Sequence, residues 1–183
     1  MNADDPANLD FTTLIAPDTP APPVREAATP EEEEECLIGA QALGRDGFHL
    51  VAARRAAKAG TTSAILIVDD DLPTGELAAR VLRRAGFQAA VVGSPRDAAR
   101  HMNALGAPGL LLLDVEMPEM NGFDFLARLR SSKRLSETPV ILFTALSERR
   151  HVVRGLLAGA DGYVAKPIAG SALVAAVRTV LAA

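Results

Sequence analysis

A chain of 183 residues is long enough for one globular domain with a tail, but short for two full domains. Its net charge of −4 argues against non-specific nucleic-acid binding, and its single cysteine, Cys36, excludes an internal disulfide. The N-terminus lacks the basic and apolar regions of a signal peptide, and no apolar run is long enough to cross a membrane. We therefore expect a cytoplasmic protein with no membrane partner.

The N-terminal third of the chain differs in charge from the rest. Residues 1–60 carry 11 acidic and 5 basic side chains, whereas residues 61–183 carry 12 acidic and 14 basic ones. Residues 1–35 are rich in proline and end in a run of five glutamates, which predicts a disordered tail. Residues 36–63 are interpreted as a linker, and good helix formers predict a helix over residues 48–59 within it.

From residue 64 onward, short apolar runs alternate with amphipathic segments. The runs are rich in Ile, Val and Leu, which is typical of buried strands, and the amphipathic segments indicate helices. In chain order the pattern predicts strand 64–68, helix 74–85, strand 88–92, helix 95–105, strand 110–113, helix 122–129, strand 140–143, helix 148–158, strand 163–165 and helix 171–181.

This alternation predicts the fold class and the domain boundary. Five strand–helix units in residues 64–183 indicate an α/β domain with a doubly wound, five-stranded parallel sheet and five helices. Ligands of such open sheets bind beyond the carboxyl ends of the strands. The functional site is therefore expected at that edge.

Polar side chains follow four of the five predicted strands. The first strand is followed by three aspartates, residues 69–71, and the third by Asp114. Thr144 follows the fourth, and Lys166 follows the fifth. Because the strands are parallel, we expect these carboxylate, hydroxyl and ammonium groups to meet at one edge.

This combination of groups suits phosphoryl transfer. Clustered carboxylates raise one another's pKa unless a hard cation such as Mg²⁺, which prefers oxygen ligands, relieves the repulsion. A carboxylate beside such an ion can attack phosphorus and form an aspartyl phosphate, whose oxygens a lysine and a hydroxyl can stabilise.

Four stretches of the chain resemble the receiver domain of bacterial two-component response regulators, the CheY-like family. They are ILIVDDD (65–71), LLLDVEMPEMNGFDFL (111–126), ILFTALS (141–147) and GADGYVAKPI (159–168). The resemblance implies a flavodoxin-like strand order of 2-1-3-4-5. It also implies a phosphorelay function, in which phosphorylation switches a protein-interaction face.

The resemblance assigns the phosphoacceptor and the metal ligands. It implies that Asp114 is phosphorylated, and that Asp69, Asp70 and Asp114 bind Mg²⁺ together with the backbone carbonyl of Glu116. In this reading the domain catalyses only its own phosphorylation and dephosphorylation and is otherwise not an enzyme.

The resemblance also assigns a switch. Thr144 would hydrogen-bond the phosphoryl group, and Lys166 would pair with it. Tyr163 would turn inward when Thr144 moves, and the Lys166–Pro167 peptide bond would be cis.

The implied partners are a histidine kinase or histidine phosphotransfer protein and a separate downstream protein. Direct DNA binding is not expected, because few residues follow the last predicted helix. The basic side chains of Arg149, Arg150 and Arg154 provide either a solvated face or a docking surface. Dimerisation is left open, because the last helix is nearly all apolar or small.

Two other functions are compatible with parts of the pattern. A haloacid-dehalogenase-type phosphohydrolase would use a nucleophile in residues 69–71, although Leu72 and Pro73 follow where that motif expects Thr or Val. A receiver-like scaffold would never be phosphorylated, although such proteins usually lose an acid or the lysine. The residue that carries phosphate distinguishes these readings.

Overall fold

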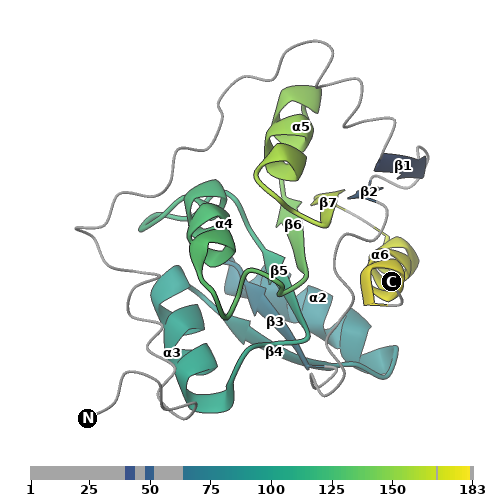
Figure 1. Ribbon diagram of the computed structural model, residues 1–183. Helices are drawn as coiled ribbons and strands as arrows, with labels where there is room; N and C mark the ends of the chain where they lie inside the picture. The colour runs from purple at the N-terminus through teal and green to yellow at the C-terminus, as the bar shows by residue number, and fades with distance from the viewer. Residues whose placement is uncertain (1–39, 44–47, 52–63, 168, 182–183) are drawn as a thin grey trace, which may run out of the picture.

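The computed structural model describes residues 40–43, 48–51, 64–167 and 169–181, which form a seven-stranded sheet and five helices (Figure 1). None of the helices in this described part is long and apolar enough to cross a bilayer. In chain order the elements are β1 (Ala40–Leu43), β2 (Phe48–Val51), β3 (Ala64–Val68), α2 (Leu72–Arg84), β4 (Gln88–Val92), α3 (Pro95–Leu105), β5 (Leu110–Leu113), α4 (Gly122–Ser131), β6 (Val140–Thr144), α5 (Arg149–Leu157), β7 (Gly162–Ala165) and α6 (Gly170–Leu181).

Five of the strands form the predicted doubly wound parallel sheet. Their order is β4-β3-β5-β6-β7, and each neighbouring pair is parallel. This is the expected order 2-1-3-4-5, so the fold class is confirmed. The ten predicted elements from residue 64 onward lie within two residues of the observed bounds.

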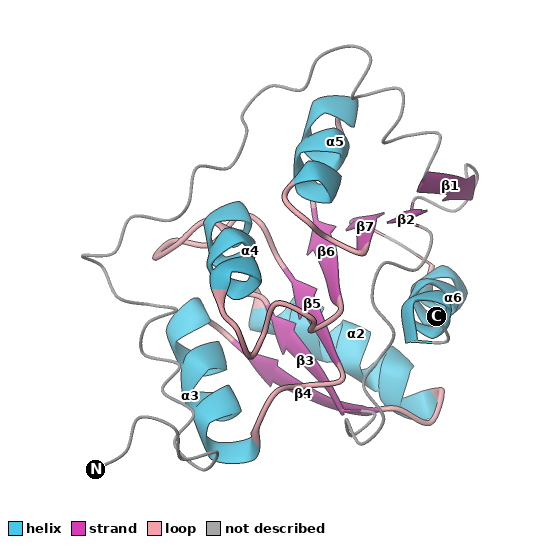
Figure 2. Ribbon diagram, in the orientation of Figure 1, coloured by secondary structure: helices cyan, strands magenta, loops and turns pink. Residues whose placement is uncertain are grey.

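Helices cover both faces of the parallel sheet (Figure 2). Alternate residues of β3 point to opposite faces, as the strand period requires. Leu66 and Val68 pack with buried residues of α3, α4 and α5, whereas Ile65 and Ile67 pack with those of α2 and α6. Because both faces are buried, the strands are apolar without alternation.

Side-chain caps determine where two of the helices begin. The Asp71 carboxylate accepts hydrogen bonds from the Thr74 amide (3.4 Å) and the Thr74 hydroxyl (2.7 Å). Helix α2 therefore starts two residues earlier than predicted. The Ser94 hydroxyl accepts from the Asp97 amide at 3.1 Å, which starts α3 as predicted.

The clearest departure from the sequence prediction is an antiparallel hairpin, β1–β2, which adds two strands to the expected five. The sequence predicts a helix from residue 48, but residues 48–51 form β2. Strand β2 pairs with β1 on one side and with β7 on the other. Helix propensity is a weak preference, and the backbone groups of the edge strand β7 provide a competing set of hydrogen bonds.

Other parts of the N-terminal prediction lie outside the described residues. These are the tail over residues 1–35 and the rest of the predicted helix, residues 52–59. The boundary at residue 64 stays a prediction.

A buried arginine joins the loops that lead into β6 and β7. The Arg130 guanidinium, from α4, donates to the carbonyl oxygens of Ser136 (3.0 Å), Thr138 (2.8 Å) and Gly159 (2.9 Å). It also pairs with the Asp161 carboxylate at 3.0 Å. Both side chains are largely buried, with 13% of Arg130 and 5% of Asp161 exposed. The guanidinium thus holds these loops together where the two strands begin.

Candidate functional site

Three of the predicted site residues directly follow the last residue of a parallel strand, and the sheet itself positions them. The backbone amide of Asp69 donates to the last carbonyl of β4 (3.1 Å). The amide of Asp114 donates to the last carbonyl of β3 (2.8 Å), and that of Lys166 to the last carbonyl of β6 (2.8 Å). Each residue is therefore held by one further rung of the ladder beyond its own strand.

These three side chains meet at the carboxyl edge of the sheet, and Asp70 joins them. The Lys166 ammonium nitrogen lies 2.7 Å from Asp69 Oδ2 and 3.2 Å from Asp114 Oδ2. Carboxylate oxygens of Asp69, Asp70 and Asp114 lie within 4.8 Å of one another. Asp69 and Asp114 are buried, whereas Asp70 is exposed. The acidic cluster therefore has a solvent-facing side at Asp70.

The acidic cluster carries more negative charge than Lys166 neutralises. Burial raises the pKa of the Asp69 carboxyl, and the charge of Asp114 adds to this effect. The Lys166 ammonium and the Asp71 amide, 3.0 Å from Asp69 Oδ1, act in the opposite direction without cancelling it. Oxygen donors with excess negative charge are what a hard divalent cation requires.

Asp71 has a different role from the two aspartates that precede it. The Thr74 hydroxyl and then the Thr74 amide lower the pKa of its carboxyl, because both donate hydrogen bonds to the ionised form. Its carboxylate caps α2 rather than joining the acidic cluster.

Backbone contacts orient the Asp114 side chain. Its Oδ1 accepts a hydrogen bond from the Val115 amide at 2.7 Å. Helix α4 begins at Gly122 against this turn. A Cβ at that position would collide with the Asp114 carbonyl oxygen and lie 2.7 Å from Val115 Cα. Glycine is required here so that α4 can approach the strand end.

The two predicted switch residues are joined through the backbone of Leu146. Thr144 and Tyr163 are fully buried, on β6 and β7. The Leu146 amide donates to the Thr144 hydroxyl oxygen at 3.3 Å. The Tyr163 hydroxyl donates to the Leu146 carbonyl at 2.6 Å. Burial, with a smaller effect of the Asp114 charge, raises the pKa of Tyr163, so its hydroxyl stays a donor.

Leu146 is the part of this arrangement that sequence reasoning missed. Its contribution comes from backbone N–H and C=O groups, which every non-proline residue carries. The available signal was its position in the turn two residues after Thr144.

Lys166 and Glu116 complete the predicted set. The Lys166–Pro167 peptide bond is cis, as the resemblance implies. The Lys166 ammonium also lies 4.9 Å from the centre of the Phe143 ring. Glu116 is exposed two residues after Asp114, and its carbonyl as a metal ligand stays a prediction.

The basic side chains of α5 have separate partners. Arg150 pairs with Glu148 at 2.9 Å, and the Arg154 guanidinium lies 4.5 Å from the centre of the Phe123 ring. Arg149 also has an interaction of its own.

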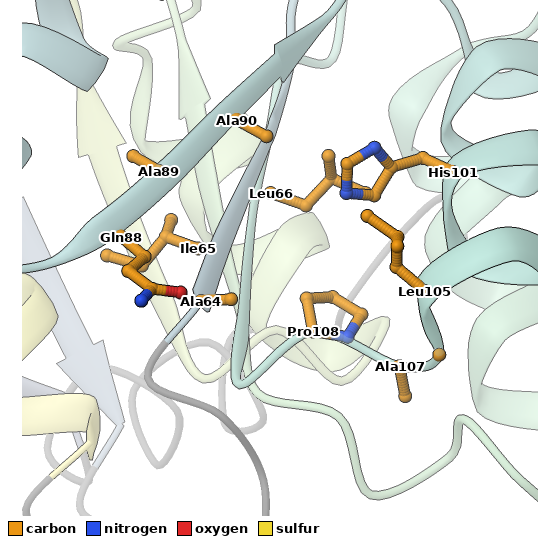
Figure 3. Close-up of a pocket in the computed structure, with 11 residues that line it drawn as sticks. Ala64, Ile65, Leu66, Gln88, Ala89, Ala90, His101, Leu105, Ala107 and Pro108 are labelled. Carbon is orange, nitrogen blue, oxygen red and sulfur yellow. The ribbon is translucent and has the colours of Figure 1, made fainter.

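A pocket lies at the end of the strands opposite the acidic cluster (Figure 3). This pocket of about 430 Å³ is lined by the first residues of β3 and β4 and by His101 and Leu105 of α3. No carboxylate lines it. Because the acids follow the last residues of their strands, this pocket is not part of the acidic cluster.

Known proteins of similar sequence match the part of the chain that forms the parallel sheet and its helices. The family model of the response regulator receiver domain matches residues 65–178. The chain is 38% identical to the transcriptional regulatory protein CusR of Escherichia coli K12 over 117 residues, 64% of this chain and 50% of CusR. It is 42% identical to the DNA-binding response regulator MtrA of Mycobacterium tuberculosis over 114 residues, 62% of this chain and 48% of MtrA.

Solved structures show the same architecture. The chemotaxis protein CheY4 of Vibrio cholerae superposes with a TM-score of 0.61 and 25% sequence identity, over 66% of this chain and all of CheY4. The chain therefore belongs to the response regulator receiver family of two-component signalling. It spans about half the length of the curated relatives it matches.

The comparisons correct one expectation. The prediction that this chain does not bind DNA directly is wrong, because the relatives it matches are named as a transcriptional regulatory protein and a DNA-binding response regulator. That prediction rested on the few residues after the last helix, which do not limit what the protein binds.

Proposed function

We propose that Asp114 accepts a phosphoryl group in an Mg²⁺-dependent reaction and that this modification switches an interaction face of the domain. The observation that carries the proposal is the meeting of Asp114 with Lys166 and two further carboxylates at the carboxyl edge of the sheet. Membership of the receiver family supports it.

In the proposed reaction, a carboxylate oxygen of Asp114 attacks the phosphorus of a donor such as acetyl phosphate. A new P–O bond forms, and the bond between phosphorus and the leaving acetate breaks with its electron pair. The Lys166 ammonium, 3.2 Å from Asp114 Oδ2, would pair with the phosphoryl oxygens. The hydrogen bond from Val115 to Oδ1 would restrict the carboxylate to one orientation.

The acidic cluster fits a magnesium ion by the chemistry of its donors. Asp69, Asp70 and Asp114 would supply carboxylate oxygens, and Glu116 its backbone carbonyl. The exposure of Asp70 leaves space for the waters that Mg²⁺ retains. When bound, the ion supplies positive charge to the acids and to the phosphoryl group.

The proposed signal leaves the site through Thr144. A phosphoryl oxygen offers its hydroxyl a charged acceptor, which is stronger than a neutral one. Movement of Thr144 would change its contact with the Leu146 amide, and Tyr163 is bonded to the carbonyl oxygen of the same residue. The expected inward turn of Tyr163 does not start from solvent, because its side chain is already fully buried. Tyr163 would instead respond by shifting into the space that Thr144 leaves.

The names of the relatives favour a transcriptional output. Both matched regulators act on DNA or on transcription by name. We propose that phosphorylation of Asp114 controls DNA binding by this protein. Its role is then in signalling rather than in metabolism. Family membership sets the phosphohydrolase alternative aside, whereas the scaffold alternative predicts no labelling at all.

The test is phosphorylation with acetyl phosphate and Mg²⁺, followed by mass spectrometry to locate the modified residue. Wild type should be labelled at Asp114, and Asp114→Asn should lose labelling completely. The matched control is Glu119→Gln, which removes an exposed acid five residues away and should label as wild type does. Stoichiometric labelling of Asp114→Asn at another residue, or no labelling of wild type, would overturn the proposal.

A further inference from the structure

The edge of the parallel sheet at β7 is covered by a segment from the N-terminal part of the same chain. Strand β2 pairs antiparallel with β7, with Phe48 opposite Val164, His49 opposite Tyr163 and Leu50 opposite Gly162. Strand β2 also lies next to α6. Without β2, the backbone groups on this side of β7 would form an edge open to any other strand.

We propose that the β1–β2 hairpin, residues 40–43 and 48–51, is an intramolecular cover for the β7 edge and that phosphorylation of Asp114 weakens its pairing. The proposal deepens the function proposed above and depends on it. In the unphosphorylated state, the β7 edge is therefore covered by this chain's own hairpin. Release of the hairpin would expose β7 to a partner strand.

The first argument is that the hairpin pairs with the residue that carries the switch. The backbone of Tyr163 lies between Leu142 of β6 on one side and His49 of β2 on the other. Its hydroxyl donates to the Leu146 carbonyl at 2.6 Å. A shift of Tyr163 therefore acts on the central one of the three residue pairs between β2 and β7.

The second argument is that Tyr163 has little space in which to move independently of its neighbours. Helix α5 approaches it at Gly155, where an added Cβ would lie 3.0 Å from Tyr163 Cδ2 and 2.5 Å from Leu142 Cδ1. Close packing of this kind favours discrete arrangements over continuous deformation. A change at Leu146 is therefore passed to the β7 backbone rather than absorbed locally.

The third argument is that a short pairing suffices because it is intramolecular. Twelve residues, 52–63, link β2 to β3 within the same chain. Such a tether gives the hairpin a high effective concentration at the β7 edge. Three residue pairs are then enough to cover β7, and a modest loss of pairing energy is enough to release it.

The experiment follows amide hydrogen exchange residue by residue by NMR, on the full chain with Mg²⁺, with and without beryllofluoride as a phosphoryl mimic. Among residues 48–50 and 162–164, the amides that point across the β2–β7 pair, about every second one, should be protected without the mimic. Their exchange should be at least about fivefold faster with it, the low end of typical coupling between two sites. Unchanged exchange in these residues, alongside altered exchange around residues 144–146, would overturn the proposal.

Two variants at residue 49 sharpen this test. Because β2 lies between β1 and β7, its amides face one strand or the other, so His49→Pro removes a ladder donor. His49→Val keeps the donor and should behave as wild type. By reciprocity, His49→Pro should bind beryllofluoride more tightly, by the same factor. Equal affinity of the two variants would contradict the coupling.

Two further observations distinguish the hairpin from a second copy of the chain, and a failure of this proposal from a failure of the proposed phosphorylation site. Protection of residues 162–164 that falls on dilution would mean that a second copy, not the hairpin, covers β7, and the proposal would fail. Protection independent of concentration supports the hairpin. If beryllofluoride changes no exchange around Asp70 and Asp114, the proposed phosphorylation site fails instead, which is a distinguishable result.

Discussion

The two ends of the parallel sheet each contain buried carboxylate next to a basic side chain, but they differ in how completely the charges are matched. At the end where β6 and β7 begin, Arg130 bonds to one carboxylate and to three carbonyl oxygens. The partner carboxylate, Asp161, also accepts from the Val140 amide at 2.8 Å. This end is a closed network of hydrogen bonds.

At the carboxyl end, three carboxylates lie close together, and the Lys166 ammonium contacts two of them, Asp69 and Asp114. Burial, with a smaller effect of the Asp114 charge, raises the pKa of Asp69, and the contacts with Lys166 do not cancel this effect. Buried carboxylates with a basic partner therefore stabilise the fold where every polar group has a hydrogen-bond partner. Where the carboxylates outnumber the basic groups, the same residue types provide a site for a cation.

The largest effect is expected from breaking the hydrogen-bond network of Arg130 and Asp161. Arg130→Ala leaves the buried Asp161 carboxylate and three loop carbonyls without this donor. The free energy of unfolding should fall by about 3–5 kcal/mol, measured by urea denaturation. Labelling of Asp114 by acetyl phosphate should persist in the folded protein.

The control for Arg130 is Arg100→Ala. Arg100 pairs with Asp97 at 3.2 Å on the surface, with 71% of its side chain exposed. Its loss should cost less than about 0.5 kcal/mol, because exposed pairs contribute little. A similar small loss for Arg130→Ala would contradict the structural role of the closed network.

A smaller effect is expected from removing one charge from the acidic cluster at the carboxyl ends of the strands. Asp70→Asn removes one charge from the acidic cluster without changing its shape. Mg²⁺ affinity, measured by calorimetric titration, should fall by about tenfold, or about 1.4 kcal/mol. Glu137→Gln changes an exposed acid just before β6, at the opposite end of the sheet, and should bind Mg²⁺ as wild type does. Equal affinity of the Asp70 variant would place the metal elsewhere.

The smallest effect concerns pH. The pKa of Asp69 is raised above its ordinary value of 3.8, so the folded protein keeps this proton at pH values where the unfolded chain has lost it. Stability therefore falls as pH rises above about 3.8 through the raised pKa, and above that range the ionised group costs stability.

Asp69→Asn removes this titration. In metal-free buffer the variant should be as stable as wild type below pH 3.8. It should become increasingly more stable than wild type as the pH rises through the raised pKa, and the difference should then stay constant. Thermal unfolding across this range measures the difference. A constant difference at all pH values would show that Asp69 is not destabilised by burial, and Mg²⁺ should reduce the difference.

The parallel part of the fold is predictable from local patterns. Apolar runs such as Leu110–Leu113 and amphipathic segments between them specify the strands and helices, and the residue after each strand is visible in the sequence. Parallel pairing then brings Asp69, Asp114 and Lys166 to one edge. These positions agree with the structure, whereas their chemical roles stay predictions that the labelling experiment tests.

The hairpin is the part that local patterns did not predict. Residues 48–59 contain good helix formers, yet residues 48–51 pair with β7, because an unpaired strand edge offers backbone hydrogen bonds that propensity does not record. A strand that depends on a partner more than 100 residues later carries little signal of its own.

For the site as well, the sequence indicates the candidate residues, whereas the tertiary structure determines their contacts. Residue types and strand ends, which are local, were enough to identify the acids, Thr144 and Lys166 as candidates. The contact between Lys166 and Asp69 spans 97 residues, and the link between Thr144 and Tyr163 runs through the backbone of Leu146. Such contacts come from the packing of distant segments and from main-chain groups common to nearly all residues, so they have no sequence signature.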